Sequence, residues 1–133
     1  MSAFKSIRAI NYTVLFVRDM AAMRRFYEDV LGFALTRELS PRWREYQIGA
    51  NTLALAMPGP MTAGDPPMPN GSAALQLAFK VSPAEVDQCA DELAKQGVEI
   101  VSPPTDRPFG HRTLFFRDPD GNLLEIYAEI PPS

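Results

Sequence analysis

Short apolar runs rich in β-branched and aromatic residues alternate along the chain with one longer amphipathic segment in each half. In the first half, residues 11–17 predict a strand. Residues 20–31 carry apolar side chains at steps of three and four positions, which predicts an amphipathic helix. Asp19 is a typical N-cap for this helix, and Gly32 is a typical stop. With three further strands expected at 33–39, 43–48 and 52–57, the first half has the predicted order βαβββ.

The same order restarts after residues 58–72, where five prolines and three glycines predict a linker. A strand is expected at 74–81. The following Ser82-Pro83-Ala84-Glu85 has the pattern of a capping box with proline at the first helical position, so a second helix should begin there and end before Gly97. Three strands, 98–101, 113–117 and 123–128, complete a second predicted βαβββ unit.

The two halves align with each other through their first strands. Residues 12–17 lie over 76–81 without a gap, and 31–33 then meet 96–98. Because one such unit leaves a sheet face uncovered, the repeat predicts two sheets that face each other across a cavity. We therefore expect one domain over 1–133, consisting of module one (8–57), the linker (58–72) and module two (73–130).

Composition narrows the partners of this domain. The 133 residues are 46% hydrophobic, which is enough for one independent core, and the net charge of −3 without a basic run argues against nucleic acid. The single cysteine, Cys89, cannot form an internal disulfide and fits a small helix-core residue. No unbroken apolar stretch resembles a signal peptide or a membrane span. We expect a cytoplasmic protein with neither nucleic acid nor membrane as a partner.

The clearest local motif is the sequence FFRDPDGNLLEI at 115–126, preceded by FGHR at 109–112. Its Asp-Pro-Asp-Gly core predicts a structural turn, whether or not the motif also has a functional role. Together with the predicted helix sequence at 19–33 and the βαβββ repeat, this motif resembles the sequences of the vicinal-oxygen-chelate superfamily, which includes glyoxalases, bleomycin resistance proteins and extradiol dioxygenases. The resemblance spans 10–129. It implies an α+β fold in which two βαβββ modules form curved mixed sheets around a cavity.

Alternation along the last strand selects the first candidate site residue. Leu124 and Ile126 should face the helix, so Glu125 should point into the cleft, where a carboxylate can act as a general base. We therefore propose Glu125 as the candidate catalytic residue. The candidate ligand-binding residues are Tyr12, Trp43, Ala54, Gln76, His111 and Tyr127.

Each of these candidates has a structural alternative. His111, the sole histidine, is equally well interpreted as a loop residue that orders the approach to the next strand, and aromatic residues such as Trp43 are often plain packing. Arg42, Arg44 and Arg112 are interpreted as solvated surface charges rather than anion ligands.

In metal-dependent relatives one position on the first strand and one on the last strand of each module bind the ion. The resemblance places these positions on Tyr12, Ala54, Gln76 and Glu125. Alanine offers no donor, a phenol is a rare ligand, and a neutral amide oxygen is a weak one. We expect a pocket without metal or other cofactor; if Zn, Ni, Mn or Fe is bound, its ligands are Gln76 and Glu125.

Three functions remain open. The favoured one is a protein that binds a small molecule, as the bleomycin resistance branch does. The second is a metal-dependent enzyme, a lactoylglutathione lyase-like lyase or isomerase or a ring-cleaving dioxygenase, whose metal site is completed by Glu45, His111 or the substrate itself. The third is a metal-free enzyme with Glu125 as general base. A homodimer is expected, because a second copy would cover exposed sheet edges.

Overall fold

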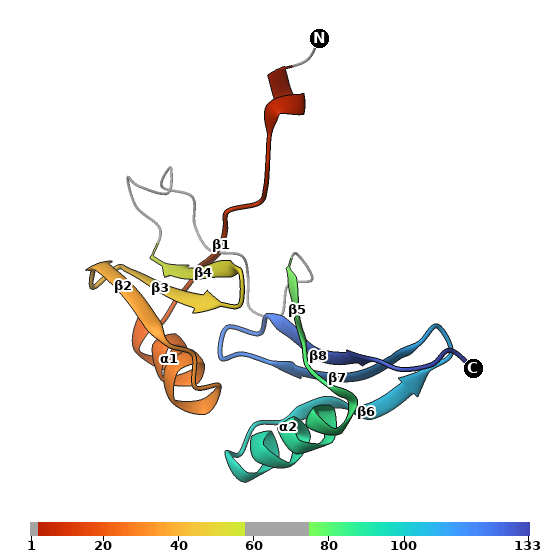
Figure 1. The fold of residues 1–133 in the computed structure, drawn as a ribbon. Helices are drawn as coiled ribbons and strands as arrows, with labels where there is room; N and C mark the ends of the chain where they lie inside the picture. The colour runs from red at the N-terminus through yellow and green to blue at the C-terminus, as the bar shows by residue number, and fades with distance from the viewer. Residues whose placement is uncertain (1–2, 58–74) are drawn as a thin grey trace. The chain divides into compact units, whose positions relative to one another are not determined.

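The computed structural model describes residues 3–57 and 75–133, and the chain divides into two compact units, Met1–Pro67 and Met68–Ser133. Figure 1 shows the elements of each unit. The predicted linker, 58–72, lies outside the described residues. No helix in the described ranges is long and apolar enough to cross a membrane.

The first unit contains one mixed four-stranded sheet in the order β1-β4-β3-β2. Strands β1 and β4 are parallel, whereas β3 is antiparallel to both of its neighbours. Its βαβββ order confirms the prediction. The elements are η1 (Ala3–Ser6), β1 (Tyr12–Phe16), α1 (Met20–Arg24), η2 (Arg25–Val30), β2 (Leu35–Ser40), β3 (Trp43–Ile48) and β4 (Asn51–Ala56).

The helix of the first unit begins and ends where its sequence predicts, but it is not uniform. The Asp19 carboxylate accepts a hydrogen bond from the Ala22 amide at 3.1 Å, and Gly32 has a φ of 73° after the last turn. Between them, α1 passes into the π-helix η2. The wider turn accompanies the burial of two consecutive aromatic residues, Phe26 and Tyr27, which are 7% and 0% exposed.

The second unit repeats this topology, with the strand order β5-β8-β7-β6 and a parallel β5–β8 pair. Val14 is paired with Ala54 in the first sheet, and Ala78 is paired with Glu125 in the second. Ala54 and Glu125 therefore occupy equivalent positions, as the internal repeat predicts. The elements are β5 (Gln76–Lys80), α2 (Pro83–Lys95), β6 (Ile100–Arg107), β7 (His111–Arg117) and β8 (Leu123–Glu129).

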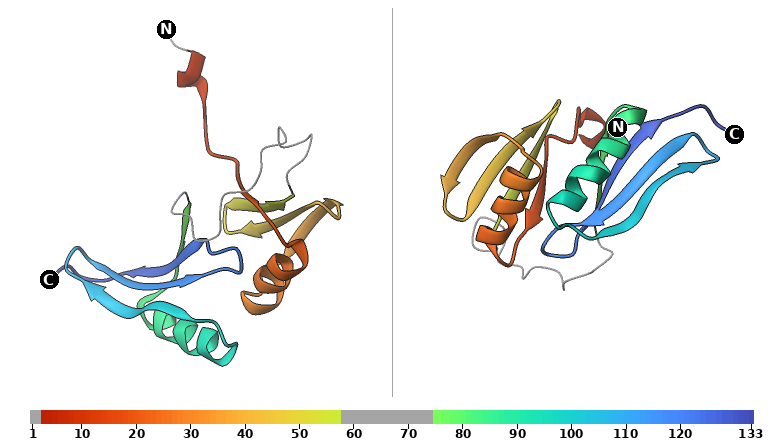
Figure 2. Two further views of the ribbon diagram at one scale, coloured as in Figure 1. Left: turned by 180° about the vertical axis from the view of Figure 1, so that it is seen from behind. Right: turned by 90° about the horizontal axis from the view of Figure 1, so that it is seen from below.

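Helix α2 lies against one face of the second sheet (Figure 2). The capping box is present: the Ser82 amide donates to Glu85 Oε1 at 2.9 Å, and Gly97 follows the helix with a φ of 77°. Val86 and Leu93 are the buried residues of this helix. Cys89 is only partly buried, which still raises the pKa of its thiol by desolvation.

Three strands of the second unit extend beyond their predicted ends, β8 by the single residue Glu129. Strand β6 continues from Ile100 to Arg107 through Pro103 and Pro104, with register shifts against β7. Proline removes a backbone donor, but β6 is an edge strand, where one row of backbone groups has no ladder partner. Strand β7 begins at His111, so this histidine lies on a strand.

The turn between β7 and β8 is held by one buried carboxylate. Asp118 is 5% exposed, and its Oδ1 accepts hydrogen bonds from the amides of Asp120 at 3.0 Å and Asn122 at 2.9 Å. Gly121 adopts a φ of 85° in this turn. The structural interpretation of the Asp-Pro-Asp-Gly motif is thereby confirmed.

Candidate functional site

The second sheet has one face covered by α2 and an opposite face, here called the second open face, that no helix in the described part of its own unit covers (Figure 2). Leu124 and Ile126 of β8 are 0% and 8% exposed, whereas Glu125 and Tyr127, which alternate with them, are half-buried. This alternation is the predicted one. By strand register, the second open face includes Gln76, Ala78, Lys80, His111, Thr113, Phe115, Glu125, Tyr127 and Glu129.

A hydrogen bond joins two of the predicted site residues on this face. The Nε2 amide of Gln76 on β5 donates to Oε1 of Glu125 on β8 at 3.0 Å. Gln76 is paired in register with Leu123, so Glu125 is its diagonal neighbour across the parallel pair. A neutral amide donor orients the carboxylate without cancelling its charge. Glu125 therefore presents a carboxylate of fixed orientation on the second open face.

Three rings lie together at the other end of the face. The imidazole of His111 stacks on Tyr127 with ring centroids 4.7 Å apart and an interplanar angle of 29°. Phe109 contacts the same imidazole edge to face at 5.2 Å and is 69% exposed. The structure thus brings His111 and Tyr127 together, and Phe109 adds an exposed ring that is not among the predicted ligand-binding residues.

The turn that carries Phe109 is fixed by the residues after β8. Gly110 is buried with a φ of 98°; its carbonyl accepts from the Ile130 amide at 2.9 Å, and the Pro108 carbonyl accepts from the Ser133 amide at 3.3 Å. A Cβ at Gly110 would lie 3.1 Å from the Ile130 carbonyl oxygen. The approach to His111 is therefore set by close backbone contacts.

The first sheet has an equivalent face, the first open face, opposite α1 and η2. Tyr12, at 50% exposure, and half-buried Trp43 have ring centroids 6.3 Å apart at 81°. The Trp43 indole Nε1 donates to Glu45 Oε2 at 2.7 Å. Ala54 is 0% exposed and is paired in register with Glu45.

The sequence pattern suggested Glu45 only as an additional metal ligand. The Trp-x-Glu spacing places both side chains on one strand face and was the available signal.

On the helix side of the first sheet, Arg44 corrects the prediction of a solvated charge, since it is only 6% exposed. Its Nε donates to Glu28 Oε2 at 2.9 Å, and a second guanidinium nitrogen contacts Glu38. The Tyr46 hydroxyl donates to the same Glu28 oxygen at 2.7 Å. This cluster ties η2 to β3. It faces away from Trp43 and Glu45, because adjacent strand residues point to opposite faces.

The cluster shifts the ionisation of its members. Burial raises the pKa of Tyr46 well above its ordinary value, and the hydrogen bond to Glu28 adds to this shift. Burial also acts to raise the pKa of Glu28, but the hydrogen bonds from Tyr46 and Arg44 and the charge of Arg44 outweigh it and lower the pKa. Glu28 is thus held as a carboxylate at neutral pH.

Arg112 is also engaged within the protein. It contacts Asp106 at 2.7 Å and Asp87 at 3.3 Å, with 28% of its side chain exposed. The hydrogen bond to Asp106 raises the pKa of Arg112. Because Arg112 alternates with His111 and Thr113 along β7, it lies on the helix side and away from the second open face.

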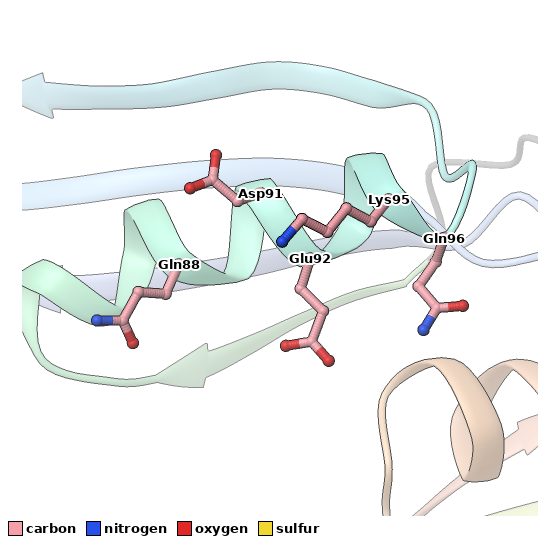
Figure 3. Close-up of a pocket in the computed structure, with 5 residues that line it drawn as sticks. All are labelled: Gln88, Asp91, Glu92, Lys95 and Gln96. Carbon is pink, nitrogen blue, oxygen red and sulfur yellow. The ribbon is translucent and has the colours of Figure 1, made fainter.

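A polar depression on the outer side of α2 is a separate feature (Figure 3). Its side chains come from α2 and from Gln96, which directly follows the helix, and none comes from a strand. They include both charges and amides, as expected for the solvated side of an amphipathic helix. The depression is lined by Gln88, Asp91, Glu92, Lys95 and Gln96.

The residues at the family's metal positions do not fit a divalent transition metal. Ala54 has no donor atom, and the amide nitrogen of Gln76, which is not a metal donor, faces Glu125. Within 3–57 and 75–133, no group of three or more His, Cys, Asp or Glu side chains is placed to hold an ion. Only Glu125 provides a strong donor at these four positions.

Comparison with known proteins identifies the family. Residues 9–126 match the model of the Glyoxalase/Bleomycin resistance protein/Dioxygenase superfamily, so the chain belongs to this superfamily. It is 30% identical over 123 residues to the virulence protein STM3117 of Salmonella typhimurium, covering 90% of this chain and 83% of that protein. It is also 30% identical over 132 residues to the uncharacterized protein YwkD of Bacillus subtilis, covering 92% and 98%.

Solved structures agree with this assignment. A glyoxalase/bleomycin resistance protein/dioxygenase from Nocardioides superimposes with a TM-score of 0.80 at 28% identity, over 96% of this chain and 87% of the other. Lactoylglutathione lyase from Agrobacterium tumefaciens gives a TM-score of 0.73 at 25% identity, over 90% and 92%. The predicted superfamily and the fold of two βαβββ modules are confirmed.

Proposed function

We propose that this member of the superfamily binds a small molecule on the second open face without a transition metal. The observation that carries the proposal is the Gln76–Glu125 hydrogen bond, which positions a carboxylate on that face. The stacked rings of His111 and Tyr127 lie on the same face. A ligand that combines a planar group with a hydrogen-bond donor would use both features.

The absence of a metal requirement is part of the proposal and follows from the donor set. With no donor at Ala54 and the Gln76 amide nitrogen directed at Glu125, an ion would have one strong protein ligand at the family positions. This donor set disfavours lyase, isomerase and dioxygenase reactions that need a metal to polarise substrate oxygens.

A second candidate is a metal-free reaction in which Glu125 accepts a proton. It is favoured by the hydrogen bond that orients the carboxylate and by the likeness to a lactoylglutathione lyase. A general base must lie within hydrogen-bond reach of the proton it removes, so the ligand of the second open face would also be the substrate. A dependence of turnover on the Glu125 carboxylate in a pH–rate profile would favour catalysis over binding alone.

We further propose a cytoplasmic homodimer. Each sheet is open, with β1 and β2 at the edges of the first and β5 and β6 at the edges of the second. Unpaired edges are commonly covered by another chain, and the lone thiol of Cys89 suits a reducing compartment. Light scattering at micromolar concentration should give twice the chain mass; a strict monomer would rule out the dimer.

The test of the binding function is a thermal-shift screen with small aromatic compounds, thiol conjugates and antibiotics. A ligand that binds the folded state raises the apparent melting temperature by mass action. We expect at least one class to give a saturable rise in the wild-type protein that is reduced in Glu125→Gln. Equal responses in both proteins to every compound that binds would contradict the placement of the ligand beside Glu125.

A further inference from the structure

The first open face carries a different chemistry from the second. Tyr12 and Trp43 meet edge to face, with ring centroids 6.3 Å apart. The indole of Trp43 donates to Glu45 Oε2 at 2.7 Å, so a carboxylate is fixed beside the two rings. We propose that this trio binds an organic ammonium group, such as a quaternary amine.

No basic side chain in the described part of the chain forms an ion pair with Glu45. Its register partner on β2 is Arg37, but the two form no such pair. The neighbouring Arg44 lies on the opposite strand face and is occupied by Glu28 and Glu38. A carboxylate that accepts its hydrogen bond from a neutral indole keeps its negative charge and favours a cationic ligand.

The rings select the kind of cation. An ammonium group over an aromatic face is attracted by the ring quadrupole, and the attraction grows when the group is desolvated. A small inorganic cation requires several oxygen ligands, whereas Glu45 supplies the only carboxylate of the trio. Alkyl groups on nitrogen would also contact the apolar side chains of Val14 and Phe16, which share the face with Tyr12.

The floor of this face is made of small side chains. Ala56 is paired in register with Trp43, and Ala54 is paired with Glu45. Both alanines are 0% exposed, so the larger neighbours cover them and form the accessible surface. A ligand would therefore contact the two rings and the carboxylate. Ala54 provides no donor to a metal ion, and an organic cation needs none at this position.

This inference rests on the proposed function to the extent that both assign the sheet faces to small molecules, but its residues are separate. Trp43 is the only tryptophan of the chain, so the tryptophan fluorescence reports on the surroundings of this one ring. The probe is choline, which carries a permanent charge, and the control compound is 3,3-dimethylbutan-1-ol, which has the same shape without the charge. Ionic strength is kept constant with sodium chloride.

Choline should change the Trp43 emission saturably, and the neutral alcohol should bind at least tenfold more weakly. Glu45→Gln retains a hydrogen-bond acceptor for the indole while removing the charge, so its choline affinity should fall at least tenfold. Tyr12→Leu should also weaken binding, because it removes one ring. Glu99→Gln, an equivalent change at an exposed position of the other unit, should have no effect.

Absence of a saturable response to choline, an equal response to the neutral alcohol, or unchanged affinity in Glu45→Gln with its native circular dichroism spectrum would each overturn the inference. These outcomes leave the Glu125 experiment untouched. Conversely, a failed thermal-shift screen with a positive choline titration would overturn the function proposed for the second open face and retain the ammonium site.

Discussion

The Nε2 of Gln76 lies 3.0 Å from Oε1 of Glu125, although 49 residues separate them in the chain. Replacing Glu125 with Gln removes the charge and keeps the size and hydrogen-bonding capacity of the side chain. The variant should fold with a melting temperature close to that of the wild type. Its affinity for a ligand found by thermal shift should fall at least tenfold, which corresponds to about 1.4 kcal/mol.

The matched control for this prediction is Glu99→Gln in the same unit. Glu99 is exposed and lies between α2 and β6, outside the strands of the second sheet. Isothermal titration of both variants separates a local effect of Glu125 from a general effect of charge on this unit. Equal affinities of Glu125→Gln and wild type would show that Glu125 is a solvated surface residue without a role in ligand binding.

Arg44 links η2 to β3 through Glu28, and removal of its charge would leave a carboxylate without its main partner. Arg44→Met preserves much of the apolar stem. We expect it to lower the free energy of unfolding by about 3 kcal/mol, because one member of a buried ion pair is lost. Urea unfolding measures this change. The exposed Arg37→Met is the control and should shift stability by less than about 0.5 kcal/mol; comparable losses in both variants would refute a special role for the cluster.

The lowered pKa of Glu28 predicts the sign of an acid effect on stability. The folded protein favours the deprotonated form of Glu28. This carboxylate therefore stabilises the fold at pH values above 4.5, the ordinary pKa of a glutamate side chain. The contribution is lost as the pH falls through the folded-state pKa. Glu28→Gln should therefore be less stable than wild type at neutral pH, and the difference should shrink below pH 4.5. The neighbouring exposed Asp29→Asn serves as control, and a gap for Glu28→Gln that does not change with pH would contradict the prediction.

Gly110 combines a φ of 98° with a tight contact to the residues after β8. Gly110→Ala should lower the free energy of unfolding by about 2 kcal/mol, because backbone strain adds to a contact with the Ile130 carbonyl. Gly49→Ala is the matched control: its φ is 57°, but a Cβ there would meet nothing within 4 Å. Only the strain of about 1 kcal/mol is expected at Gly49. A smaller loss at Gly110 than at Gly49 in denaturant unfolding would be inconsistent with the close contact.

Local patterns were sufficient to predict both modules and the sheet face on which Glu125 lies. Strand alternation depends on neighbours such as Leu124 and Ile126, and helix ends depend on residues such as Asp19 and Gly97, so each signal lies within a few positions. The extension of β6 through Pro103 and Pro104 was missed because tolerance of proline depends on the edge position of the strand, which follows from the topology of the whole sheet.

The chemistry of the faces was less predictable than their positions. The burial of Arg44 depends on Glu28, 16 residues earlier, and the orientation of Glu125 depends on Gln76 in the parallel strand. A single sequence contains no pattern for such contacts between distant residues. The Trp43–Glu45 pair is the exception, since its two-residue spacing is visible along the chain.

The most direct test of the central claim, ligand binding without a metal, is a thermal-shift titration of one ligand from the screen in the presence and absence of EDTA. Ligand binding through Glu125 and the His111–Tyr127 stack should give the same concentration dependence under both conditions. A response that EDTA abolishes and that Zn²⁺, Ni²⁺, Mn²⁺ or Fe²⁺ restores would contradict the account and show that the protein binds its ligand through a metal.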